Sequence, residues 1–306
     1  MSTNIITHDR VIWTDISCPT PDDMAQLQDQ YPQFHRLNLH DCQTDLEFPK
    51  LEPHQDYLFL VVQVPLWDEE KEVYRPSEID IFLTRGTLVT SHAGNLRPLN
   101  DLFQQAQTDE QWCEKLMGQG ASPLLYAVLQ VLADSCFPYM DRINQTIRHI
   151  EDHLFNEDTE HLIKDIAFVR RDVIALRHIL RPQLDVIQRL EKGKWPFIQE
   201  GLHLYWSDIN TSLLKLHALL DEQRDVINGL SDTVDTLASH RIDGVVRVLT
   251  LITILTAPLT LLATVFGINI EFTSPKFHSL LFITINVAGI TLTALLVWYL
   301  HRKRWL

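Results

Sequence analysis

VVRVLTLITILTAPLTLLATVF, residues 245–266, is the stretch that decides the fold. Its one charged residue, Arg247, lies near the edge, and an α-helix of this length reaches roughly 33 Å. The hydrocarbon core of a bilayer is about 30 Å thick, whereas long helices of soluble proteins normally show a polar face. We therefore predict that residues 245–266 form a first membrane-spanning helix.

A second apolar stretch, residues 278–300, contains no Lys, Arg, Asp or Glu and ends in Trp298 and Tyr299, where an interfacial aromatic belt is expected. It is predicted to be a second span. The basic tail HRKRWL, residues 301–306, belongs in the cytoplasm by the positive-inside rule. Two crossings place both termini in the cytoplasm of an inner (cytoplasmic) membrane protein, with residues 267–277 as a short external loop.

The charge is divided unevenly along the chain. Five of the 26 basic residues and one of the 40 acidic residues follow Gly244, so the first 244 residues carry a formal charge of −18. An acidic body repels nucleic-acid phosphates and raises the local concentration of cations. Nucleic acid is therefore excluded as an expected partner, and divalent cations and membrane lipid are the partners that the sequence favours.

The part before the spans changes character along its length. Residues 1–155 contain short runs rich in Val, Ile, Leu and Phe, such as DYLFLVVQVPLW and EIDIFLTRGTLVTSH, which are bounded by Pro and Gly and predict strands. Helical patterns follow, and residues 156–244 are predicted to be a helical region with a stalk helix. The predicted fold class is an α+β membrane protein with an N-terminal α/β cytoplasmic domain.

The stalk is predicted from a heptad seam. Apolar residues recur at alternating steps of three and four after Pro196, with Gln223 at the one polar position of the seam. The apolar members are Ile209, Leu213, Leu216, Leu220, Ile227, Leu230, Val234 and Leu237. The stalk is expected to continue through Gly244 into the first span, and the pattern leaves open whether the seam faces the chain's own helices or another subunit.

Threonines form a stripe along the first predicted span. They recur at steps of 3, 3, 4 and 4, which confines them to one face of a helix. They are Thr250, Thr253, Thr256, Thr260 and Thr264. Hydroxyls in an apolar span indicate a surface turned toward water, and several copies would have to surround such a pore. The alternatives are that each hydroxyl bonds to its own i−4 carbonyl, or that the stripe is a helix–helix contact.

After this span the sequence reads FGINIEF, and the segment RVLTLITILTAPLTLLATVFGIN, a short loop, a second span and RKRWL together resemble the CorA-type divalent metal ion transporters. That family is identified by a Gly-Met-Asn tripeptide after its first span. The tripeptide here is Gly267-Ile268-Asn269, and this Gly-Ile-Asn variant resembles the ZntB branch, which transports zinc. The resemblance implies a homopentameric funnel whose first spans line a central pore.

In such a pore the Gly-x-Asn loops ring the outer entrance. The resemblance makes Gly267, Ile268 and Asn269 the selectivity loop, in which amide oxygens hold a hydrated divalent ion through its waters. Ile in place of Met puts a magnesium preference in doubt. Glu271 is the one acidic residue of the loop and a possible ring of charge.

Three residues are expected to line the cytoplasmic end of this pore. Val246 and Leu249 fall on the face of the threonine stripe and are expected to form an apolar constriction. Asp243 is expected at the cytoplasmic mouth, where its copies would form a ring of charge or where it would be a solvated surface residue. The fourteen histidines are interpreted as dispersed structural residues.

The predicted function is transport of a divalent cation, Mg²⁺, Zn²⁺ or a related ion, which is substrate rather than cofactor. The alternative is a membrane-anchored cytoplasmic sensor that conducts nothing. An anchor requires neither a threonine stripe nor a Gly-Ile-Asn exit. No phosphate-binding glycine loop or nucleophile elbow is present in the sequence, so an enzyme is not expected, nor a cofactor.

Overall fold

The computed structural model describes residues 3–44, 46–154, 159–199 and 201–267, and in the C-terminal part residues 283–284, 287–289, 291, 293–295, 298 and 302. The chain divides into two compact units, Met1–Ser231 and Asp232–Leu306.

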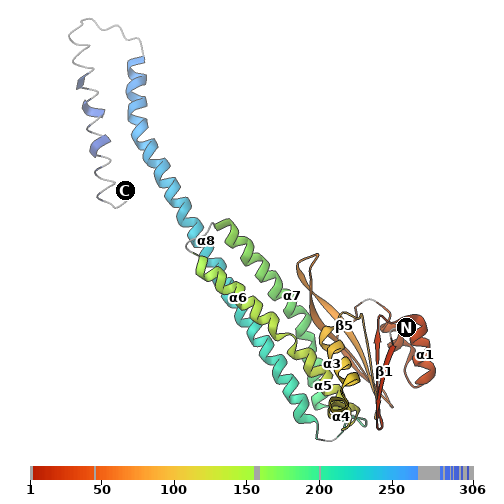
Figure 1. The fold of residues 1–306 in the computed structure, drawn as a ribbon. Helices are drawn as coiled ribbons and strands as arrows, with labels where there is room; N and C mark the ends of the chain where they lie inside the picture. Colours follow the sequence, from red (N-terminus) through yellow and green to blue (C-terminus); the bar gives the residue numbers. More distant parts are fainter. Residues whose placement is uncertain are drawn as a thin grey trace. The chain divides into compact units, whose positions relative to one another are not determined.

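The first unit is built on a six-stranded mixed sheet (Figure 1). Its strands are β1 (Thr3–His8), β2 (Val11–Ser17), β3 (Lys50–Pro53), β4 (Leu58–Asp68), β5 (Val73–Leu83) and β6 (Thr87–His92). Their order across the sheet is β1-β2-β6-β5-β4-β3. The pair β2–β6 is parallel and the other four pairs are antiparallel.

The central strands are apolar on both sides because helices cover both faces of the sheet. In β4, the consecutive residues from Leu58 to Val61 are all buried. Phe59 and Val61 join a core cluster with Met24, Leu27 and Leu39. That face is covered by α1 (Pro21–Gln30) and α2 (Arg36–Asp41).

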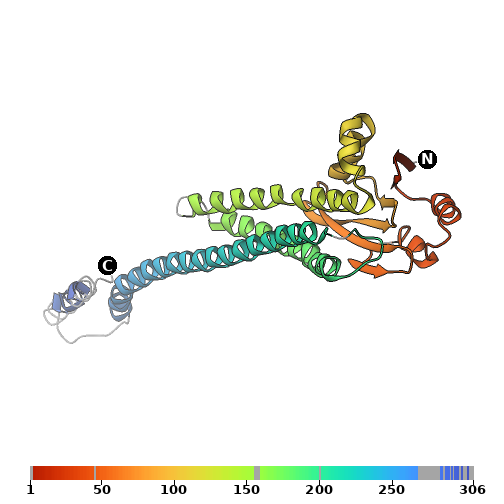
Figure 2. The ribbon, with the colours of Figure 1, turned by 90° about the horizontal axis from the view of Figure 1, so that it is seen from below.

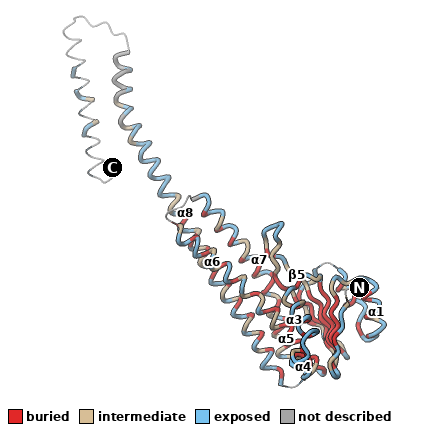
Figure 3. The backbone as a smooth tube through the Cα atoms, in the orientation of Figure 1, coloured by how far each residue is buried: buried red, intermediate tan, exposed pale blue. Residues whose placement is uncertain are grey.

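The opposite face is covered by α5 (Ala121–Asp134) and α7 (Thr159–Lys192), which contact the central strands. Two shorter helices, α3 (Arg97–Thr108) and α4 (Glu110–Met117), pack on α5. Trp13 of β2 is fully buried and meets Phe103 of α3 edge to face, with ring centroids 4.8 Å apart. Buried residues concentrate in the sheet, and further buried positions recur along the helices of this unit (Figure 3).

Three long helices complete the unit. In Figure 2, α6 (Phe137–His153), α7 and the first part of α8 (His203–Gly267) run side by side. The predicted order of an α/β region followed by helices is confirmed, and the predicted long helix is present, since α8 passes through Gly244 without interruption.

The heptad seam is buried within the chain. All of its members from Ile209 to Leu230, Gln223 included, are at most 8% exposed. Gln223 donates from Nε2 to the Met140 carbonyl and to Asn144 Oδ1, both at 3.0 Å, so the polar seam position is bonded to α6. The seam of the first unit therefore faces the chain's own helices, which decides between the two possibilities that the pattern left open.

The second unit contains the rest of α8, which ends at Gly267. The described residues between 283 and 302 are helical. Among the described residues, no single helix has both the length and the apolar composition of a membrane span, although Glu110–Met117 and Ala121–His153, bent by 105°, have them as a pair. Several side chains of the predicted first span and most residues of the second lie outside the described part.

Candidate functional site

The threonine stripe lies on α8, and its hydroxyls bond back to the helix. Each of four hydroxyls donates to the carbonyl four residues earlier: Thr250 to Val246 at 2.7 Å, and Thr253, Thr256 and Thr260 to Leu249, Ile252 and Thr256, each at 2.9 Å. All five threonines of the stripe, Thr264 included, are exposed. The back-bonding that the sequence left as an alternative is thus present, on side chains that also face outward.

This geometry decides which hydrogen bonds the stripe can offer. A hydroxyl has one hydrogen to donate and two lone pairs that accept. In the four bonded threonines the hydrogen is used within the helix, so lone pairs are what remain on the outer side. Such a surface suits a cation, or the hydrogens of water molecules around a cation, and it offers an anion little.

The two apolar residues of the predicted constriction share the face of the stripe. Val246 and Leu249 are the residues whose carbonyls accept from Thr250 and Thr253. Their side chains are 54% and 64% exposed. Asp243, also exposed, lies less than two turns before Leu249 and about 36 Å before Gly267 along the helix. The structure therefore brings Val246, Leu249 and the threonines onto one continuous helical surface.

The predicted selectivity loop is described only at its first residue. Gly267 is the last described residue of α8. Ile268, Asn269 and Glu271 lie outside the described residues. Their role in the ion pathway stays a prediction.

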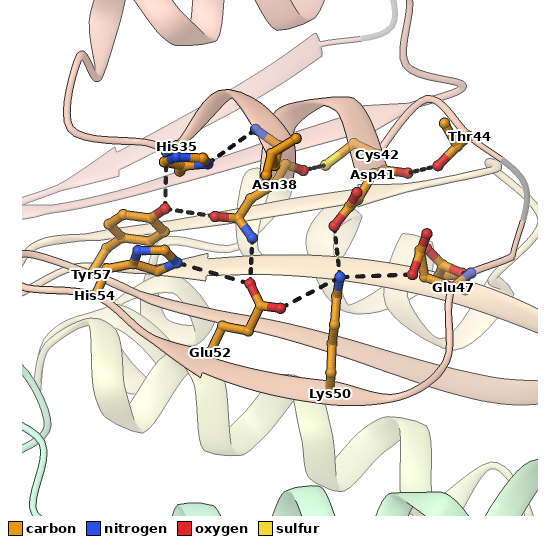
Figure 4. A network of polar contacts seen from close by, with 12 residues as sticks. His35, Asn38, Asp41, Cys42, Thr44, Glu47, Lys50, Glu52, His54 and Tyr57 are labelled. Carbon is orange, nitrogen blue, oxygen red and sulfur yellow. Dashed lines mark hydrogen bonds and ion pairs between the residues drawn. The ribbon is translucent and has the colours of Figure 1, made fainter.

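A second polar region joins α2 to the edge strand β3 (Figure 4). Lys50 of β3 lies 2.7 Å from Asp41 of α2, 3.6 Å from Glu52 and 3.7 Å from Glu47. Burial alone would lower the pKa of Lys50, but the hydrogen bond to Asp41 and the surrounding carboxylates raise it overall. The ammonium group is therefore held charged among three acids.

The same network contains a buried amide with both ends satisfied. Asn38 donates from Nδ2 to Glu52 at 2.7 Å and accepts at Oδ1 from the Tyr57 hydroxyl at 2.8 Å. That hydroxyl accepts in turn from the backbone N–H of His35 at 2.9 Å. Because these groups satisfy one another, the network fastens α2 to the sheet.

One metal-binding pattern in the sequence was overlooked. Residues 149–153 read HIEDH, in which two histidines occupy successive turns of α6, and a search for the spacing H-x-x-x-H would have found it. The rings of His149 and His153 stack with centroids 4.2 Å apart. Within the described ranges, however, no group of three or more His, Cys, Asp or Glu side chains is arranged to hold a metal ion.

Comparison with known proteins shows which family the chain belongs to. The chain matches the model of the CorA-like Mg²⁺ transporter protein family over residues 8–302. It is 26% identical over 292 residues to the metal ion transporter YfjQ of Bacillus subtilis, covering 95% of this chain and 88% of that protein. It is also 24% identical over 182 residues to the zinc transport protein ZntB of Pectobacterium atrosepticum, covering 60% of this chain and 55% of the relative.

A solved structure agrees in fold over almost the whole chain. The complete structure of the CorA magnesium transporter from Methanocaldococcus jannaschii superposes with a TM-score of 0.81 at 18% identity, covering 98% of this chain and 94% of the other. The predicted resemblance is confirmed by a family match that extends over both units. The chain belongs to the family of CorA-like Mg²⁺ transporter proteins.

Proposed function

We propose that this chain assembles as a homopentamer around a central pore and conducts divalent metal cations across the cytoplasmic membrane. Family membership gives the substrate class. The observation that carries the proposed pathway is the threonine stripe of α8, which is exposed and offers acceptor oxygens over several turns. The number five comes from the resemblance to the family.

Several copies are needed because one chain cannot surround an aqueous path. α8 is exposed in the described chain at apolar positions around the stripe, such as Val248 and Ile252 at 56% and 54%. A helix with polar and apolar faces both uncovered needs water on one side and lipid or other helices on the other. Copies of α8 around an axis meet both demands, with threonines inward and apolar residues outward.

The backbone supports a wet face at mid-span. Pro258 lies inside α8 and has no N–H to donate to the carbonyl of Ile254. A carbonyl that lacks its helical donor is tolerated at membrane depth where it faces protein or a water-filled cavity. Pro258 therefore favours water or a neighbouring helix beside this part of α8.

The proposed ion is hydrated and divalent. Mg²⁺ dehydrates reluctantly and keeps several waters in most protein sites. A ring of Asn269 amide oxygens at the outer entrance, followed by threonine oxygens, would bind such an ion through its waters. Mg²⁺ and Zn²⁺ are both candidates, because the structural relative is a magnesium transporter and the sequence relative a zinc transport protein.

We place both termini in the cytoplasm, with residues 245–266 and 278–300 as the spans and residues 267–277 outside. The support is the basic tail, residues 301–306, which the positive-inside rule assigns to the cytoplasm, and two crossings put the N-terminus on the same side. The alternative of an anchored sensor without conduction explains neither the stripe nor the family match.

Flux into proteoliposomes tests the proposal. Wild type is expected to pass Mg²⁺, Zn²⁺ or Co²⁺. The flux through Asn269→Ala should be at least about tenfold lower, because the amide ring would supply the contacts to the hydrated ion. The matched control is Asn4→Ala, which removes the same group from an exposed position of β1. Equal flux in wild type and Asn269→Ala would remove the site from the pathway, and no flux in wild type would favour the sensor.

A further inference from the structure

A pocket in the first unit combines carboxylates with other oxygen groups. Its volume is about 510 Å³, and its lining includes Cys42, Thr44, Ser77, Glu78, Asp80 and Asn95. It lies where β6 ends at His92 opposite Ile79, so that β5 continues without that neighbour. Cys42 and Thr44 are visible at the end of the network in Figure 4. The pocket is separate from α8.

Asp80 is the unusual group of this pocket. Its side chain is buried, with 4% of the residue exposed, and its Oδ1 has no hydrogen-bond partner among the described residues. Glu78, two residues earlier on the same face of β5, accepts from the backbone N–H of Glu47. An unpaired carboxylate oxygen in a buried position costs free energy, so the native structure is expected to supply a partner.

The described residues supply no counter-charge there. Burial, followed by the neighbouring charge of Glu78, raises the pKa of Asp80 well above its usual value. Burial likewise raises the pKa of Glu78, to about 7. Lys50 is engaged by Asp41, Glu47 and Glu52, and His92 Nε2 lies 3.2 Å from Asp15. Among described residues, none forms an ion pair with Glu78 or Asp80. The described ionisable groups around them are Cys18, Asp41, Cys42, Glu47, Lys50 and His92.

We propose that this pocket binds one hydrated divalent cation of the Mg²⁺ type, held by the carboxylates of Glu78 and Asp80. Thr44, Ser77 and Asn95 would accept from or donate to its waters. Mg²⁺ is usually bound by one or two carboxylates and retains several waters, for which this volume has room. The site lies within one chain, so it requires neither the pentamer nor transport.

The donor set discriminates between cations. Structural zinc sites take four ligands, mostly Cys and His. Two thiols line this pocket: Cys18 Sγ donates to the Ala93 carbonyl, and burial raises the pKa of the Cys42 thiol well above its usual value, which keeps it neutral. The described residues also hold no group of three such ligands. A hydrated cation held by two carboxylates needs neither an ionised thiol nor a third such protein ligand, whereas a tetrahedral structural zinc site needs them.

Counting bound Mn²⁺ on the purified full-length protein tests the site. Mn²⁺ takes the same oxygen ligands as Mg²⁺, and its free concentration is read directly from its electron spin resonance signal. Asp80→Asn is expected to lose one Mn²⁺ per chain. Glu78→Gln should weaken that ion by at least about tenfold, because one nearby charge changes such an equilibrium by roughly one to three powers of ten. Excess Mg²⁺ should displace the same ion from wild type.

Two control variants test whether the lost ion belongs to this pocket. Glu69→Gln makes the same change of charge at an exposed position after β4 and should keep the full count. Asn269→Ala alters the proposed pore entrance and should keep the pocket ion, so failure of the pore and failure of the pocket give different results. An Mn²⁺ count equal to wild type in both Asp80→Asn and Glu78→Gln would overturn the proposal.

Thermal unfolding adds a readout that a purely structural Asp80 would not reproduce. Without divalent ions, Asp80→Asn should unfold no earlier than wild type, since a neutral side chain replaces an uncompensated buried carboxyl. Added Mg²⁺ should raise the midpoint of wild type, because a ligand that binds only the native state stabilises it, and raise it less in the variant. A variant that unfolds earlier but gains the same increment from Mg²⁺ would assign Asp80 to packing alone.

Discussion

The two parts of α8 solve the same packing problem with different partners. From Ile209 to Leu230, every seam position is buried against the chain's own helices, and the polar position, Gln223, donates to α6. From Val246 to Thr264, the stripe residues are exposed, and the hydroxyls of four threonines bond to their own helix. The first part finds its partners within the chain, whereas the stripe of the second is left uncovered by the described residues.

This difference assigns separate tasks to the two parts. A buried seam contributes to the free energy of folding, and a substitution there should reduce stability whatever surrounds the protein. An exposed stripe contributes little to the fold of one chain, and a substitution there should act through assembly or conduction. Stability is therefore the quantity to measure in the first case, and flux in the second.

The largest effect on stability is expected from Leu220→Ala. Leu220 is fully buried in the seam, and truncating such a leucine costs about 2–5 kcal/mol of unfolding free energy. The matched control is Leu214→Ala, because Leu214 lies on the same helix with 47% exposed and should cost less than about 1 kcal/mol. Urea unfolding followed by tryptophan fluorescence measures both, and similar costs would contradict a seam buried within the chain.

A smaller effect, on flux alone, is expected from Thr256→Val. The change removes a lone-pair surface from every copy, and a hydrogen bond worth about 0.5–1.5 kcal/mol corresponds to a flux about twofold to tenfold lower. Thr236→Val is the control, because Thr236 is also exposed on α8 and bonds back to the Asp232 carbonyl at 2.8 Å, before the predicted span. Flux into proteoliposomes measures both variants. Equal losses of flux would contradict a special role for the threonines of the predicted span.

The smallest effect is expected from Gln223→Leu. Leucine completes the apolar seam and removes two hydrogen bonds, but it also removes Oε1, which has no partner among the described residues. Unfolding free energy should fall by no more than about 1 kcal/mol, while Gln223→Ala, which leaves a void, should lose more. A loss for leucine that matches or exceeds the loss for alanine would show that the hydrogen bonds, rather than the filled space, matter at this position.

The fold could be predicted where periodicity is local. The steps of three and four marked the seam, and the apolar run of β4 marked a strand, since both patterns follow from the geometry of one element. The parallel pairing of β2 with β6 could not be predicted, because it joins residues about 75 positions apart and depends on which faces the helices cover. The sequence also could not show which helices the seam packs against, because the heptad pattern is the same whether the partner is the chain's own helices or another subunit.

The candidate site stays a prediction, and what can be compared is the helical face that carries it. The stripe's spacing placed the threonines and Leu249 on one face, as the structure has them, but spacing does not say where a hydroxyl hydrogen points. Asn269 remains a prediction from the resemblance. The pocket of Asp80 gave no signal in the sequence, because Asp80 stands in an apolar strand and acquires its neighbours from α2 only through the fold.

The back-bonded threonines also bear on what else could travel with the ion. A chain of hydroxyls relays a proton only if each oxygen can receive one hydrogen and release another by turning. In Thr250, Thr253, Thr256 and Thr260 that hydrogen is engaged by a carbonyl of the helix. Turning it outward would break a hydrogen bond at each step, so the threonine stripe is a poor proton wire. If the stripe lines the proposed pore, protons would have to cross along a file of water molecules.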